Sequence, residues 1–109
     1  MRRLVGIDFI IVDSTKRGVK LEEKLHSYLS KRLNNQGNGY DLLLGLDPYG
    51  NRLFTVQEIN ELINICVSLM IKYNKDDWYE NRVRKFSKKL MELCELALEQ
   101  NNVIEAIGD

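Results

Sequence analysis

Apolar side chains recur every three or four residues along two long stretches in the second half of the chain. The first stretch runs from about Val56 to Tyr73, and the second from about Trp78 to Gln100. This spacing places the apolar residues on one face of a helix and predicts two long amphipathic helices. Asp76 or Asp77 can cap the second helix, so the break is short and the pair is predicted to form a helical hairpin.

The first half of the chain carries strand-like patterns and one shorter helical pattern. Leu4 to Val12 is apolar on both alternating faces, which predicts a central strand covered on both sides or nearly so. Val19 to Leu33 has a leucine stripe typical of a helix, and Asn34 to Gly39 is a loop. Val103 to Ile107 can close the sheet as a last strand. Parallel and antiparallel placements of the first strand both remain open.

The stretch from Tyr40 to Glu58 predicts a hairpin. Residues at every second position of its first strand share one face, and they are Leu42, Leu44 and Leu46. The tetrapeptide DPYG at 47–50 has the residue preferences of a type I turn. Gly50 can adopt positive φ, so the turn is expected to continue into a short return strand at 52–54.

A capping box follows the hairpin, with Thr55 at the N-cap and Glu58 three residues later. At 109 residues the chain has the length of one domain, taken as 1–109. The elements together predict an α+β fold: a small three- to four-stranded sheet with a central DPYG hairpin, packed by about three helices. Two of these helices are long and form the helical hairpin.

Composition narrows the classes of partner and compartment. Sixteen basic and sixteen acidic residues balance, which argues against a protein that binds mainly by neutralising many phosphates. No stretch approaches the roughly 20 apolar residues of a membrane span, and Asp8 interrupts the N-terminal apolar run, so we expect a cytoplasmic protein. Cys66 and Cys94 fall on the apolar faces of helices and are predicted to be reduced core residues.

The sequence contains no catalytic motif. His26 is the only histidine and has no triad partner in sequence, the cysteines lack C-x-x-C spacing, and the glycines form no phosphate-binding loop. Asp8 is interpreted either as a buried functional acid or, in preference, as a carboxylate at a sheet edge or beside an arginine. We therefore expect no enzymatic activity, no catalytic residues, no metal site and no cofactor.

Charge divides the last helix into two halves. The basic residues of the first half are Arg82, Arg84, Lys85, Lys88 and Lys89. Glu92, Glu95 and Glu99 lie on one face of the second half, where acids oppose the helix dipole. These glutamates form either a solvated face or an acidic patch for a basic partner. A nucleic-acid function for the basic half is disfavoured because the sequence shows no exposed aromatic residues interleaved with the basic residues.

A second group of candidate partner-binding residues lies at the start of the last helix. It consists of Asp76, Asp77, Trp78 and Glu80. Trp78 either packs at the helix start or in the core, or is an exposed anchor for a partner.

The segment YDLLLGLDPYGNRLFTVQEINELINI, residues 40–65, resembles small bacterial immunity proteins of contact-dependent growth inhibition and related polymorphic toxin systems. The resemblance covers about a quarter of the chain and includes no catalytic motif. It implies a cytoplasmic protein that binds and neutralises a cognate toxin domain, often a nuclease, by occluding its active site or substrate-binding surface. An acidic inhibitor suits the positive cleft of a nuclease. The alternative is a small regulatory or nucleic-acid-associated protein that uses the basic half of the last helix.

Overall fold

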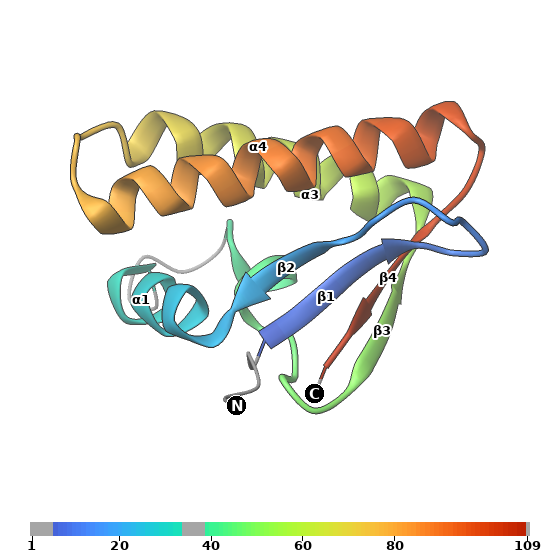
Figure 1. Cartoon of the computed structure of the whole chain (residues 1–109), viewed down its shortest axis with the longest axis horizontal. Coiled ribbons are helices and arrows are strands. Elements are labelled where there is room, and N and C mark those ends of the chain that lie inside the picture. Colours follow the sequence, from blue (N-terminus) through green and yellow to red (C-terminus); the bar gives the residue numbers. More distant parts are fainter. Residues whose placement is uncertain (1–5, 34–38, 109) are drawn as a thin grey trace.

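Four strands and two long helices form the two layers of the structure, which is a computed structural model describing residues 6–33 and 39–108 (Figure 1). The elements in chain order are β1 (Gly6–Ile11), β2 (Val19–Glu22), α1 (Glu23–Leu33), α2 (Asp41–Leu44), β3 (Asn51–Phe54), α3 (Val56–Lys72), α4 (Trp78–Glu99) and β4 (Ile104–Ile107). The strand order is β2-β1-β4-β3, and every neighbouring pair is antiparallel. The predicted α+β class, the four-stranded sheet and the two long helices are confirmed.

The central strands β1 and β4 pair with each other over Asp8 to Ile11. On β1, Ile7, Phe9 and Ile11 are buried beneath the helices, whereas Asp8 and Ile10 on the other face are half-buried. The central position of β1 is therefore confirmed, but coverage on both faces is not: the helical layer lies on one side only (Figure 1). The last apolar run forms β4, as predicted.

Helices α3 and α4 lie side by side across the inner face of the sheet (Figure 1). The capping box at the start of α3 is present, because Thr55 Oγ1 accepts from the Glu58 N–H at 3.2 Å and a Glu58 carboxylate oxygen accepts from the Thr55 N–H at 3.0 Å. Asp77 caps α4 at one of the two positions where a cap was predicted. Both helix starts and the helical hairpin are confirmed.

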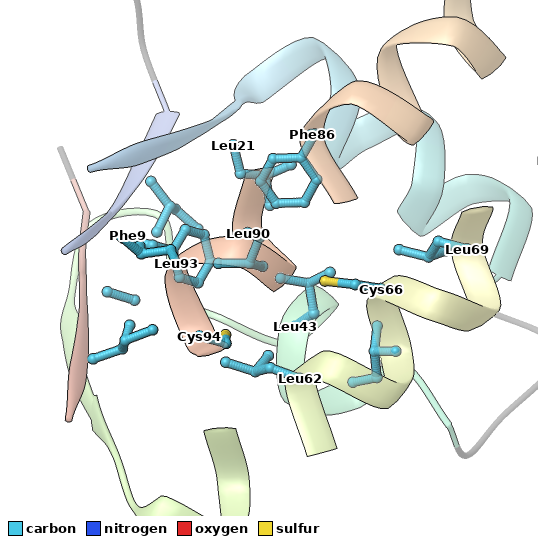
Figure 2. Close-up of a cluster of buried hydrophobic side chains, with 14 of the residues drawn as sticks. Phe9, Leu21, Leu43, Leu62, Cys66, Leu69, Phe86, Leu90, Leu93 and Cys94 are labelled. Atoms are coloured by element: carbon cyan, nitrogen blue, oxygen red, sulfur yellow. The ribbon is translucent and has the colours of Figure 1, made fainter. Parts of the chain in front are cut away.

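The core lies between the sheet and this helical pair (Figure 2). Phe9 of β1 packs against Phe54 of β3 and Phe86 of α4, with ring centroids 6.3 and 6.2 Å apart. Removing one such buried ring typically costs about 3–5 kcal/mol. Cys66 and Cys94 are buried and free, as expected for core thiols.

The predicted hairpin is wrong. The leucine-rich segment before the turn forms the short helix α2, in which the Leu44 N–H donates to the Tyr40 carbonyl at 2.8 Å and the Gly45 N–H donates to the Asp41 carbonyl at 2.8 Å. Three consecutive leucines satisfy a helical turn as well as a strand, and α2 buries Leu43 completely. Strand β3 instead pairs with β4 from the far end of the chain.

The turn itself is present, but its glycine behaves differently from the prediction. The Gly50 N–H donates to the Asp47 carbonyl at 3.2 Å, and Asp47 Oδ1 accepts from the Tyr49 N–H at 2.9 Å. Gly50 does not adopt positive φ. Gly50 instead joins the start of β3 to the end of β4, because its carbonyl accepts from the Gly108 N–H at 2.8 Å.

The helix predicted from Val19 starts four residues later. Val19–Glu22 forms β2, which pairs antiparallel with β1 and places Leu21 on the buried face of the sheet. Leu21 fits the helical leucine stripe and the strand equally well, and pairing with β1 decides between them. Most of the loop predicted at Asn34 to Gly39, and the first two residues of the Leu4 to Val12 strand, lie outside the described residues.

Candidate protein-binding surface

Glu92, Glu95 and Glu99 lie on the outward side of α4, and all three are exposed. Within the described part of the chain none of them takes part in an ion pair. Their carboxylates are therefore available to a partner from solution. Each exposed ion pair that they form would contribute only about 0.2–1 kcal/mol.

The acids of the second predicted group hold the turn between α3 and α4. Asp77 Oδ1 accepts from the Glu80 N–H at 2.9 Å, and Glu80 Oε1 accepts from the Lys75 N–H at 3.1 Å. Asp76 Oδ1 accepts from the side-chain amide of Asn81 at 3.0 Å. The hydrogen bond from the Glu80 N–H holds the pKa of Asp77 below its usual value. These carboxylates thus have a structural role, which the sequence did not indicate beyond the cap.

Arg84 closes the same turn from the first half of α4. Its guanidinium donates to the backbone carbonyls of Tyr73 and Lys75, the latter at 2.9 Å, and to the side chain of Asn81. One side chain therefore satisfies acceptors at the end of α3, in the turn and on α4. This network fixes the start of α4 and the side chains that project from it.

Three aromatic rings gather beside this turn, from α1 and from the start of α4. Tyr28 and Tyr79 stack with centroids 4.4 Å apart and planes 2° from parallel. Trp78 meets Tyr79 edge-on at 4.6 Å. Trp78 is 52% exposed and Tyr79 is 38% exposed. Trp78 therefore packs on its neighbour at the helix start but is not a core residue, and about half of its surface is open to a partner.

An arginine covers each end of this group of rings. The Arg32 guanidinium lies 4.3 Å from the centroid of Tyr28, and the Arg82 guanidinium lies 4.4 Å from the centroid of Trp78. We call this assembly the aromatic–arginine row, and it consists of Arg32, Tyr28, Tyr79, Trp78 and Arg82. Phe86, the one aromatic residue between Arg82 and Lys89, is buried, so the expectation that no exposed aromatic is interleaved with the basic residues is confirmed. The exposed ring beside Arg82 is Trp78, which lies one turn before them.

The sequence pointed to Trp78 but not to Tyr28 or Arg32. Both pairs of an arginine over a ring are four residues apart on a helix, Tyr28 with Arg32 and Trp78 with Arg82. Side chains at that spacing are neighbours, so this signal was present in the sequence. The stacking of Tyr28 on Tyr79 had no sequence signal, because it joins two helices that are far apart in the chain.

The structure does not bring the two predicted acidic groups together. Trp78 and Glu95 are 17 positions apart on one helix, which corresponds to about 26 Å along its axis. The row and the exposed glutamates therefore lie near opposite ends of α4. A partner that contacts both must lie along most of this helix.

The remaining chemistry-bearing side chains have structural surroundings. His26 Nε2 lies 2.9 Å from the Leu44 carbonyl and joins α1 to α2. Burial raises the pKa of Cys66 and of Cys94 to about 12, so both thiols are unreactive near neutral pH. Asp8 pairs with Lys20 across β1 and β2 at 3.6 Å; it lies on a central strand and not at a sheet edge, and within residues 6–33 and 39–108 it forms no ion pair with an arginine.

Among residues 6–33 and 39–108, no three His, Cys, Asp or Glu side chains are grouped closely enough to hold a metal ion. No helix in the same residues is long and apolar enough to cross a bilayer. Comparisons with protein-family models, with curated proteins and with solved structures found no match to this chain.

Proposed function

We propose that this protein is a cytoplasmic immunity protein that binds a cognate toxin domain and neutralises it by occlusion, without performing chemistry itself. The resemblance of residues 40–65 to immunity proteins motivates the proposal. The aromatic–arginine row is the observation that carries it, because Trp, Tyr and Arg are the residues that most often dominate protein interfaces.

The exposed surface of Trp78 and Tyr79 is large enough for the row to anchor the interface. The exposed fractions of Trp78 and Tyr79 are 52% and 38%. Since such side chains present about 150–250 Å² each, a partner that covers them removes about 150–200 Å² from water. At about 25 cal/mol per Å² this burial is worth about 4–5 kcal/mol before the entropy cost of association is subtracted, and three exposed ion pairs supply less.

The row is also ordered before any partner arrives. Tyr28 contacts both Arg32 and Tyr79, and Arg82 lies over Trp78. Side chains that are already in place lose little conformational entropy on binding, so more of the burial energy appears as affinity. The exposed glutamates of α4 then have a kinetic role: they attract a basic toxin surface, and a nuclease carries one for its substrate.

A second candidate function is binding of single-stranded nucleic acid by the basic half of α4. The observation that favours it is the placement of Trp78 beside Arg82. Against it, the Tyr28 ring already stacks on Tyr79 and lies beside the Arg32 guanidinium, so it offers little free surface to a base. The chain also has no net charge to attract a polyanion.

The test is affinity capture from extracts of the native cell, followed by calorimetry with the recovered protein partner. Trp78→Ala should weaken binding on the order of 100-fold, in the range of an interface hot spot. Lys88→Ala is the matched control on α4, because Lys88 is exposed and away from the row, and it should bind like the wild type. Equal affinity of both variants would remove the row from the interface. Capture of nucleic acid alone would favour the second function.

A further inference from the structure

A groove runs between the edge strand β2 and the flank of α4. It has a volume of about 250 Å³, and its lining includes Lys20 of β2 and Arg82, Lys85 and Lys89 of α4. Leu25 and Phe86, both more than nine-tenths buried, supply apolar surface to the same groove. We call it the β2–α4 groove. Through Arg82 it is continuous with the aromatic–arginine row.

Two of the four cations already have carboxylates beside them. Arg82 lies 3.7 Å from Glu22, and Lys20 lies 3.6 Å from Asp8. Lys85 and Lys89 are exposed and take part in no ion pair within the described part of the chain. The groove therefore carries an excess of positive charge that is concentrated on these two lysines.

The spacing of the two lysines determines which anionic groups can bind both ammonium groups at once. Lys85 and Lys89 are four residues apart on α4, so their positions are separated by about 6 Å along the helix axis. Side chains at positions i and i+2 of an extended segment are separated by about 6.8 Å. An extended segment with two carboxylates at that spacing can therefore meet both ammonium groups at once.

Two carboxylates and an apolar side chain fit the groove better than a run of phosphates. A nucleic acid would need more unpaired cations than two, and would leave the apolar lining from Leu25 and Phe86 without a matching group. We propose that the β2–α4 groove binds an acidic extended segment of the protein partner, in which two carboxylates at i and i+2 are followed by an apolar side chain at i+4 on the same face. This inference rests on the proposed function only in assigning that segment to the toxin domain.

The proposal also gives the partner a fixed direction along α4. Its acidic segment lies at the groove, next to the row, and its basic surface lies opposite Glu92, Glu95 and Glu99. The reversed placement would put like charges against each other at both ends of the helix. Such like-charge contacts are a common source of interface specificity.

The probe is a short fluorescein-labelled peptide with a Glu-Ser-Glu-Ser-Leu core, titrated by fluorescence anisotropy and mapped by amide chemical shifts. We expect saturable binding, with the largest shifts at Lys85 and Lys89. The double variant Lys85→Glu with Lys89→Glu should bind on the order of tenfold more weakly, and binding to the wild type should weaken with salt.

The single variants Lys85→Glu and Lys88→Glu form a matched pair. Both residues are exposed lysines on α4, and both variants change the net charge equally, but only Lys85 lines the groove. The peptide should therefore bind the Lys88→Glu variant like the wild type and the Lys85→Glu variant more weakly.

Three results would overturn the inference: no peptide binding, an equal loss of affinity in the Lys85→Glu and Lys88→Glu variants, or tighter binding of fluorescein-labelled oligothymidylate at the same lysines. A peptide with a Lys-Ser-Lys-Ser-Leu core should not bind the groove, and binding of it there would also contradict the charge argument. The outcome is separable from the proposed function. If the peptide binds but partner capture does not depend on Trp78, the role of the row in the proposed function is rejected. If capture depends on Trp78 but the peptide does not bind, only the assignment of an acidic segment to the groove is rejected.

Discussion

Replacing Arg84 tests whether the turn between α3 and α4 is held as described. Arg84→Met keeps much of the side-chain length but removes the donors to the Tyr73 and Lys75 carbonyls and to Asn81. A hydrogen bond from a charged group contributes about 1.5–3 kcal/mol when well shielded, and the contacts to Lys75 and Asn81 are exposed to water. We therefore expect a total loss of about 2 kcal/mol, most of it from the half-buried Tyr73 contact.

The assay is urea unfolding followed by circular dichroism, with thermal unfolding in parallel. For a domain of this size, a loss of about 2 kcal/mol lowers Tm by about 10 °C. Lys88→Met is the control, because Lys88 is exposed and its side chain forms no hydrogen bond or ion pair with the described residues, and it should change stability by less than about 0.5 kcal/mol. Equal unfolding midpoints for the two variants would refute the assigned role of Arg84.

Two further substitutions test the cap of α3 and the sheet edge. A backbone hydrogen bond lowers the pKa of Glu58 from its ordinary 4.5, so its stabilisation is present above that pH and lost as pH falls through the lowered pKa. Glu58→Gln should therefore be less stable than the wild type at pH 7 and equally stable in strong acid; a constant gap in urea midpoints would contradict this. Gly108→Ala places a Cβ 2.5 and 2.7 Å from backbone oxygens and should cost about 1–3 kcal/mol, whereas Gly50→Ala meets only side-chain atoms of Asp47, at 3.1 to 3.4 Å, and should cost less. Equal Tm values for the two alanine variants would count against the described turn.

The elements that the sequence predicts correctly are those with strong local signals. The two long helices have regular apolar stripes, and Thr55 and Asp77 mark their starts through hydrogen bonds made within three residues. The short strand β4 was also predicted, from its apolar run alone. Each of these elements is specified by residues close together in the chain.

The elements predicted wrongly depend on partners far away in the chain. The segment before the DPYG turn has leucines compatible with a helix or a strand, and β4 rather than this segment pairs with β3. Likewise Val19–Glu22 becomes a strand because β1 offers it an edge. The local spacing of apolar residues does not distinguish these outcomes, because the free energy of strand pairing is gained only once the sheet forms.

The candidate site was predicted in part. Trp78 was a candidate from its position at a helix start, whereas Tyr28 and Arg32 entered only when the fold placed α1 beside α4. The acids near Trp78, which are Asp76, Asp77 and Glu80, also form hydrogen bonds within the turn, and the sequence indicated only the cap. Their contact with a partner stays a prediction.

Protection of growing cells is the sharpest test that this protein neutralises a toxin through the aromatic–arginine row. The partner recovered by affinity capture is expressed from an inducible promoter, together with the wild-type chain, with the Trp78→Ala, Tyr79→Ala double variant, or with Lys88→Ala. We expect the wild type and Lys88→Ala to restore growth, while the double variant stays folded by circular dichroism and fails to restore it. Growth restored equally by the double variant, or a partner whose expression is harmless without this protein, would contradict the account.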